Sequence, residues 1–139
     1  MKKMQWQNNL SVGIEPIDNQ HKQWIEYFNN AAEAIAARQS RTQIAKTLGF
    51  LIDYTELHFS TEERFMSGSN YAGLQEHKAK HDELRRTLAN LVRDFEDEGI
   101  TSRLAEAIDI FLGNWLIQHI HEIDTKFGAF VRENKVVLS

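Results

Sequence analysis

Apolar residues recur along most of the chain at the three- and four-residue spacing of one face of an α-helix. The first stretch, 1–17, lacks this period, so we expect an extended N-terminal arm there. The pattern after it predicts four long helices, at about 18–38, 41–66, 71–97 and 101–120, and a short C-terminal helix at about 122–132. Asp18 and Thr101 are suited to cap the first and fourth helices, and Gly99 to end the third.

Four helices of about 20 residues joined by short connections are typical of an up-down-up-down bundle. The single proline and seven glycines are fewer than strands joined by tight turns usually need. The chain has 139 residues, the size of one domain, and shows no repeat or inter-domain linker. We therefore predict an all-α, four-helix bundle with an extended N-terminal arm, formed as one domain over 1–139.

The composition excludes several classes of protein. No cysteine is present, which rules out disulfides, iron–sulfur clusters and thiolate zinc sites, so that any metal ligands must be nitrogen or oxygen. The net charge of −4 argues against nucleic acid as a partner. No apolar run approaches the roughly 20 residues that span a bilayer, and no signal peptide is recognisable at the N-terminus. We expect a cytoplasmic protein, without a membrane span, that is a monomer.

Histidines and one glutamate stand where the helical pattern calls for apolar core residues. Five of the six histidines are in such positions: His21, His58, His77, His81 and His119. Glu62 lies on the same seam as His58, where a lone buried carboxylate costs several kcal/mol or is forced neutral. The pairs His58–Glu62 and His77–His81 are each separated by four residues. At this spacing two side chains share one helix face and can chelate.

A metal centre accounts for this polar core better than a set of unpaired groups. Buried imidazoles and a carboxylate without partners are costly, and coordination removes that cost. Five imidazoles and at least one carboxylate exceed the needs of one tetrahedral zinc ion, so two ions bridged by carboxylate oxygens fit better. Imidazole with carboxylate suits iron, and less specifically manganese, zinc or copper.

Other familiar catalytic patterns are missing from the sequence. It contains no H-E-x-x-H zinc helix and no Glu-x-x-His motif of the carboxylate-rich di-iron bundles. It also contains no G-x-S-x-G, no P-loop and no G-x-G-x-x-G. Hydrolytic and nucleotide-binding functions of those types are therefore not indicated.

Four segments together resemble the hemerythrin family, most closely its single-domain bacterial members. They are S-V-G-I-x-x-I-D-x-Q-H (11–21), H-F-S-T-E-E (58–63), H-K-A-K-H (77–81) and W-L-I-Q-H-I-H-E-I-D (115–124). They occur in the family's order and span nearly the whole chain.

The resemblance implies a complete ligand set for two iron ions. It implies that one iron is held by His77, His81 and His119, and the other by His21 and His58. Glu62 and Asp124 would bridge the ions, together with an oxo or hydroxo group. The ions would change between Fe²⁺ and Fe³⁺, and O2 would be the ligand at an open position on the second iron. Asp124 enters this set only through the family's H-x4-D pattern, because it is off the simple helical stripe.

Several further residues are interpreted through the same resemblance. Phe59, Trp115, Leu116 and Ile120 match the family's apolar O2 pocket, although plain bundle core explains each of them equally well. Glu63 is a candidate hydrogen-bond partner for a ligand imidazole, against a solvent-exposed helix face as the alternative.

Three positions stand apart from the family's pattern. His121, two residues after His119, points about 200° away around a helix and is not expected to be a ligand. Phe127 stands where family members commonly have tyrosine. Trp24 is bulkier than the expected leucine and is predicted to narrow access to the second iron.

The resemblance implies reversible O2 binding, for transport, storage or delivery, and no enzymatic activity. Two alternatives remain: a di-iron enzyme that reduces peroxide or nitric oxide, and an O2 or redox sensor that acts through a partner protein. The enzyme would need a proton donor beside the open position, and no tyrosine, lysine or spare histidine is placed there by the sequence.

Overall fold

The computed structural model describes residues 4–138, apart from the side chains of 110–112, and these residues form helices and no strand. The long helices are α1 (Glu15–Ala36), α2 (Arg41–Gly68) and α3 (Leu74–Glu98). A fourth rod consists of α4 (Ser102–Glu106), the π-helical η2 (Ala107–Leu112), α5 (Gly113–His119), the π-helical η3 (Ile120–Asp124) and α6 (Thr125–Glu133). The short 3₁₀ helix η1 (Asn8–Leu10) lies in the arm.

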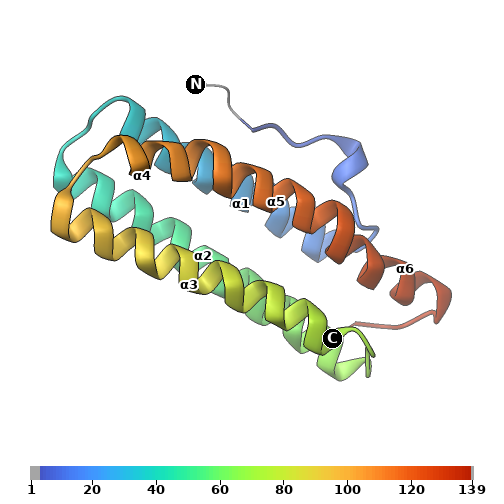
Figure 1. Ribbon diagram of the computed structural model, residues 1–139. Helices are drawn as coiled ribbons and strands as arrows, with labels where there is room; N and C mark the ends of the chain where they lie inside the picture. The colour runs from blue at the N-terminus through green and yellow to red at the C-terminus, as the bar shows by residue number, and fades with distance from the viewer. Residues whose placement is uncertain (1–3, 139) are drawn as a thin grey trace.

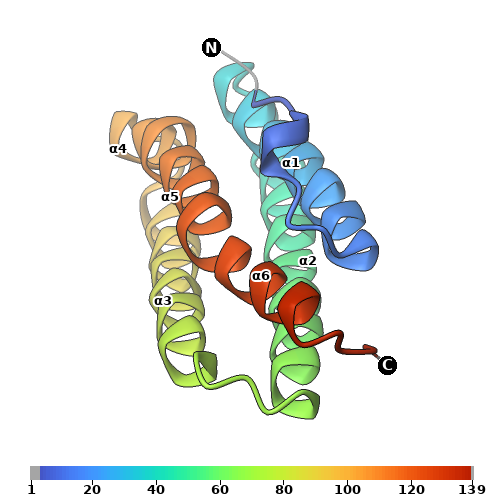
Figure 2. The ribbon, with the colours of Figure 1, turned by 90° about the vertical axis from the view of Figure 1, so that its right-hand side faces the viewer.

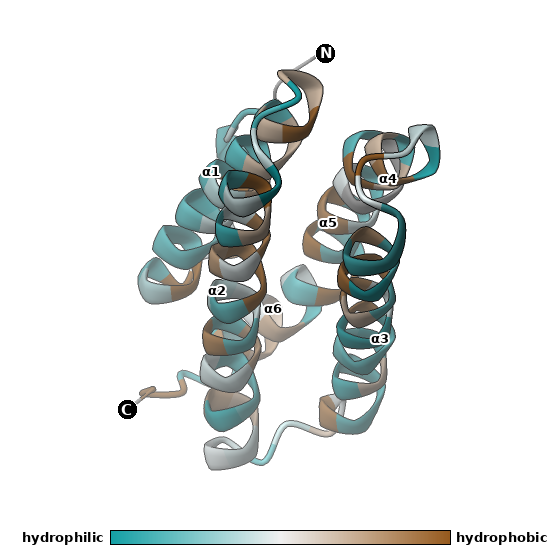
Figure 3. Ribbon diagram, turned by 90° about the vertical axis from the view of Figure 1, so that its left-hand side faces the viewer, coloured by the Kyte–Doolittle hydropathy of each residue, from teal (hydrophilic) through white to brown (hydrophobic). Residues whose placement is uncertain are grey.

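The four rods run up, down, up and down, with short connections at alternate ends (Figure 1). Figure 2 shows the arm crossing the outside of the bundle beside α1. Apolar residues follow the inner faces of the rods, and the outward faces are mostly hydrophilic (Figure 3). The predicted all-α four-helix bundle with an extended arm is confirmed. None of the helices within 4–138 combines the length and apolar character needed to cross a bilayer.

The fourth rod is continuous where the pattern suggested a break between 120 and 122. Two π-helical segments, η2 and η3, are built into it. A π turn closes its hydrogen bonds between residues five apart, so it accommodates one more residue than an α turn. The sequence period is disturbed there, although the backbone remains helical into α6, which ends at Glu133.

Helix ends differ from the prediction by up to three residues, for local reasons. α1 begins at Glu15, not at Asp18, because Pro16 is accommodated in the first turn without a backbone N–H to satisfy. It ends at Ala36 because Arg38 adopts a left-handed backbone with φ 51°. Thr101 caps α4 as predicted, its hydroxyl accepting a hydrogen bond from the Leu104 N–H at 3.1 Å.

Asp18 fastens the arm to α1 instead of capping the helix. Its carboxylate accepts hydrogen bonds from the Val12 N–H at 2.9 Å and from the Ser11 hydroxyl at 2.6 Å. Val12 is buried, and its carbonyl accepts a hydrogen bond from Arg132 at 3.0 Å. A Cβ added to Gly128 would lie 2.1 Å from the Val12 oxygen, so only glycine lets α6 and the arm come this close.

Candidate metal centre

Seven polar side chains meet in the middle of the apolar bundle. His21 comes from α1, His58 and Glu62 from α2, His77 and His81 from α3, His119 from the end of α5, and Asp124 from the end of η3. Each of them is at most 3% exposed. All seven residues that the sequence suggested as ligands are thus brought together, and every rod contributes at least one.

The seven side chains form two overlapping groups that share both carboxylates. One group contains His77, His81 and His119 with the two carboxylates, and the other contains His21 and His58 with the same carboxylates. Within each group the ligand atoms lie within 4.8 Å of one another. We call these the three-histidine group and the two-histidine group. Because the carboxylates are shared, two neighbouring ions could be held here, and one of them would have fewer protein ligands than the other.

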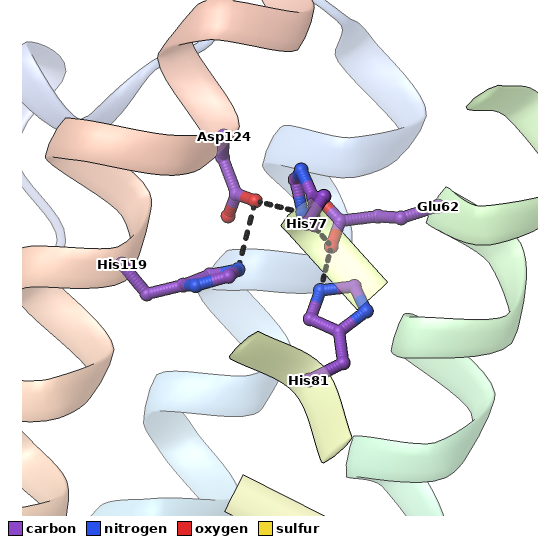
Figure 4. Close-up of side chains that lie close together, drawn as sticks. All are labelled: Glu62, His77, His81, His119 and Asp124. Carbon is purple, nitrogen blue, oxygen red and sulfur yellow. Dashed lines mark ion pairs between the residues drawn. The ribbon is translucent and has the colours of Figure 1, made fainter. Parts of the chain in front are cut away.

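The two carboxylates point at imidazole nitrogens from opposite sides (Figure 4). Asp124 has its oxygens 2.9 Å from His77 Nε2, 3.1 Å from His119 Nε2 and 3.0 Å from His21 Nε2. Glu62 Oε1 lies 3.2 Å from His81 Nε2 and 3.4 Å from the Nε2 atom of His58. All five imidazoles therefore turn Nε2 inward.

The inward atoms approach one another without the geometry of hydrogen bonds. Twelve buried side-chain nitrogen and oxygen atoms in the described residues have no hydrogen-bond partner, and all belong to these seven residues. They include all five Nε2 atoms and all four carboxylate oxygens. Lone pairs that converge on common points, rather than on one another's protons, are the arrangement a metal ion requires. The donor set, nitrogen and oxygen only, fits iron and other borderline divalent metals.

Two of the imidazoles are oriented by hydrogen bonds that their Nδ1–H groups donate. His58 Nδ1 lies 2.8 Å from the Gln20 side-chain oxygen, and His81 Nδ1 lies 2.8 Å from Glu63 Oε2. Either oxygen accepts a hydrogen bond only if Nδ1 carries the proton, which leaves Nε2 free to coordinate. The structure therefore places Glu63 where the sequence suggested it. Gln20 was missed, and its only signal was its place beside His21.

Burial and the mutual charges of the site shift several pKa values. Burial lowers the pKa of His58 to about 3, although Glu62 acts against this change. Burial also opposes the charged form of His77, but the carboxylates of Asp124 and Glu62 outweigh it and raise that pKa to about 10. Burial favours the neutral form of Glu62 and Asp124, yet the neighbouring imidazoles hold both pKa values well below their usual range. Both carboxylates are thus anionic at neutral pH, as ligands of a cation must be.

Asp124 reaches the site because η3 is a π turn. His119 and Asp124 are five residues apart, which in a regular α-helix would place them about 140° apart. Between Ile120 and Asp124 the backbone is π-helical, and residues five apart face the same side. The widened turn therefore brings Asp124 back onto the face of His119, their side-chain atoms 3.1 Å apart.

Aromatic rings cover the imidazoles on both sides of the site. Phe59 stacks on His81 with ring centroids 3.8 Å apart, and Trp115 stacks on His119 at 4.6 Å. Trp24 lies over the two-histidine group, 4.9 Å from the His58 ring. Its indole N–H donates to the Thr55 hydroxyl at 2.8 Å, which fixes the ring in place. Leu116 and Ile120, which lie within three residues of His119 in the sequence, are buried, whereas Trp115 is partly exposed.

The remaining positions singled out by the sequence lie apart from the ligand atoms. His121 is exposed and belongs to neither group. Phe127 is buried and packs against Tyr71, with centroids 5.1 Å apart. An apolar ring in this position makes no hydrogen bond toward the site.

Comparisons with known proteins find the same family throughout the chain. A model of the hemerythrin HHE cation-binding domain matches residues 12–131. A bacteriohemerythrin of Pseudomonas aeruginosa is 33% identical over 130 residues, covering 93% of this chain and 82% of that protein. The myohemerythrin of Sipunculus nudus is 30% identical over 122 residues, covering 88% of each chain. The crystal structure of a wild-type hemerythrin is similar with a TM-score of 0.81 at 30% identity, covering 92% of this chain and 97% of that one.

Proposed function

The chain belongs to the hemerythrin family, and from that premise we propose that it binds O2 reversibly at a non-heme di-iron centre. The seven buried side chains described above would hold the two ions. The observation that carries the proposal is the inequality of the two groups, which share Glu62 and Asp124 but have three histidines on one side and two on the other. An ion in the two-histidine group has fewer protein ligands, and so has room for an exogenous one.

Two iron ions, when bound, would supply the electrons for reversible binding of O2. The protein supplies the surroundings that keep this binding reversible. Trp24 and Phe59 are at most 2% exposed and cover the site with rings, which excludes water from it. Apolar surroundings favour uncharged O2 over hydrated anions as the molecule that enters.

Among the described residues, the hydrogen bonds and ring contacts to the two-histidine group offer no free acid to drive O2 onward to reduced products. Apart from the seven site residues themselves, these contacts come from Trp24, Phe59 and Gln20. The Trp24 N–H is committed to Thr55, and the Gln20 amide donates to Thr61 at 3.3 Å. Because reduction of peroxide consumes protons, this arrangement favours a binder of O2 over a peroxidase.

The outer hydrogen bonds prepare the site for metal before it is loaded. Gln20 and Glu63 hold His58 and His81 in the tautomer that presents Nε2. The raised pKa of His77 means that a proton occupies the site at neutral pH and must leave when metal binds. Metal binding should therefore release protons, and the affinity for metal should fall at acidic pH.

The test combines metal analysis with the visible absorption spectrum. Purified protein should contain two iron ions per chain. Reduced without oxygen it should be colourless, gain a charge-transfer band in air and lose that band under vacuum. A variant carrying His121→Gln is the matched control, because His121 is an exposed histidine outside both groups.

Two results would overturn the proposal. Immediate oxidation in air, with no reversible band, would favour the peroxide- or nitric-oxide-reducing enzyme or the sensor. Purification with another metal and no iron would remove the O2 function while leaving the ligand set intact.

A further inference from the structure

Arg85 lies on the surface of α3 but connects to the metal centre from two directions. Its Nη1 atom is 3.1 Å from Glu63 Oε2, and its guanidinium lies 5.1 Å from the centre of the Phe59 ring. Glu63 and Phe59 both contact His81, the first through a hydrogen bond to its Nδ1–H and the second by ring stacking. Arg85 thus contacts both groups that hold one ligand imidazole, without touching the imidazole itself.

The contacts around His81 fix it on two sides. Glu63 Oε2 accepts from Nδ1 at 2.8 Å, which sets the rotation and tautomer of the ring. Phe59 lies against the face of the ring, with an interplanar angle of 9°. We propose that Arg85 is a positioning residue for the three-histidine group: it clamps Glu63 and Phe59 on His81 and so slows the release of metal. We call these three residues, Arg85, Glu63 and Phe59, the clamp.

Arg85 is itself held rigidly enough to serve this purpose. Its Nε and Nη2 atoms bind the two oxygens of Glu56 at 2.8 and 3.2 Å, and Nη1 also binds Asp82 at 2.8 Å. A guanidinium held in a two-pronged pair loses little further freedom on making another bond. The Arg85 side chain is 25% exposed and those of Glu56 and Asp82 are 56% and 44% exposed, so solvent screens these pairs and they restrict the guanidinium mainly through their geometry.

Glu63 needs such a partner more than the matching residue across the site. Its side chain is 19% exposed, and a carboxylate with access to water can rotate away from His81. Across the site, His58 Nδ1 donates the corresponding hydrogen bond to the side-chain oxygen of Gln20, a neutral amide whose nitrogen donates to the Thr61 hydroxyl. The two halves of the centre therefore have different outer partners. On the three-histidine side the partner is the Glu63 carboxylate, paired with Arg85, and on the two-histidine side it is the Gln20 amide, bonded to Thr61.

This inference rests on the proposed di-metal site, but not on O2 binding. The experiment therefore uses Co²⁺-loaded protein and follows transfer of Co²⁺ to an excess of chelator. Protein that binds Co²⁺ but not O2 would refute the proposed function and leave the clamp testable. Wild-type protein that binds no metal would refute both.

The variants R85Q and E63Q should each release Co²⁺ from one of the two positions about 10-fold faster, because outer-sphere partners of ligand histidines typically contribute 10- to 100-fold in metal affinity. R85K keeps the charge but not the planar fork that binds Glu56 and Glu63 together, so it should restore only part of the wild-type rate. R86Q removes the same charge from the next, exposed residue and should leave the rate unchanged. The ¹⁵N NMR signal of His81 Nδ1 should shift in R85Q and not in R86Q.

The double variant R85Q/E63Q distinguishes two explanations: that Arg85 acts on His81 through Glu63, or that it only joins α2 to α3. If Arg85 acts through Glu63, adding R85Q to E63Q changes the release rate by less than twofold. Fully additive effects, or an E56Q variant as fast as R85Q, would show that Arg85 only joins α2 to α3. Equal release rates for R85Q and R86Q would also overturn the proposal.

Discussion

Removing the metal is expected to lower the free energy of unfolding by at least about 4 kcal/mol, the stabilisation that a ligand gives at about 1,000 times its Kd. The structure explains why the effect should be large. The five Nε2 atoms and the four carboxylate oxygens at the site lack hydrogen-bond partners within the protein. At about 1 to 3 kcal/mol for each unsatisfied group, these nine atoms would cost about 9 to 27 kcal/mol. This is as large as the whole stability of a typical domain, about 5 to 15 kcal/mol.

The metal-free protein must therefore relax part of this cost by other means. A proton shared by His77, Asp124 and Glu62 satisfies some of the atoms, as the raised pKa of His77 indicates. Water that enters the loosened site satisfies others. Neither provides what two ions provide, since coordination engages all five Nε2 atoms and both carboxylates at once.

The assay is urea unfolding followed by circular dichroism, on loaded protein and on protein stripped with a chelator. The midpoint of the loaded form should rise with the concentration of free metal, and returning Co²⁺ to the stripped form should restore it. A stripped protein with the same midpoint as the loaded one would refute this reasoning, because the polar core would then be satisfied without metal.

Three further predictions concern protonation, the arm and the spare histidine. In metal-free protein the folded-state pKa of His77, about 10, lies above the ordinary histidine value of 6.5, so its contribution to stability is complete below pH 6.5 and is lost as the pH rises toward 10. Urea midpoints should fall over this range. Gly128→Ala should cost about 2 kcal/mol or more in urea unfolding because its Cβ meets the Val12 oxygen, whereas Gly49→Ala, with open space around it in α2, should be neutral or stabilising. His121→Gln should leave two metals per chain by elemental analysis, because His121 is exposed.

Regular α-helical geometry made most of the bundle predictable, and with it six of the seven polar side chains at the site. His58 with Glu62, and His77 with His81, are four residues apart within uninterrupted helices, so that spacing alone places each pair on one face. The apolar stripe identified that face as the buried one. The sequence could therefore indicate which side chains point into the core before any contact between helices was known.

Contacts that cross between helices were beyond this reasoning. Gln20 reaches His58 from α1, and Arg85 reaches Glu63 from α3, over separations of 38 and 22 positions in the chain. Both are polar residues at helix surfaces, and periodicity does not distinguish them from solvent-exposed neighbours. The prediction that Asp18 caps the first helix was wrong for a similar reason, because its carboxylate binds the arm instead. In each case the partner is decided by packing and not by local sequence.

The π turn at η3 explains both why Asp124 escaped the pattern and how it is positioned. An α-helix places residues four apart on one face, and η3 accommodates one additional residue between His119 and Asp124. Deleting Glu122, which is exposed, would leave these two residues four apart, the spacing of the other chelating pairs. The turn should then become α-helical while Asp124 still faces the site and α6 keeps its phase.

The deletion variant should therefore still bind two metal ions, with affinity reduced by no more than about 10-fold, or about 1.4 kcal/mol. Asp124→Asn is the comparison, because it keeps the π turn but removes the anionic oxygen shared by both groups, and it should lose far more affinity. Titration with Co²⁺ measures both variants. Loss of an ion in the deletion variant would mean that the widened turn sets the direction of the carboxylate, and not only its face. Retention of both ions would mean that the π turn only accommodates one additional residue. The ligand geometry would then come from the packing of the four rods.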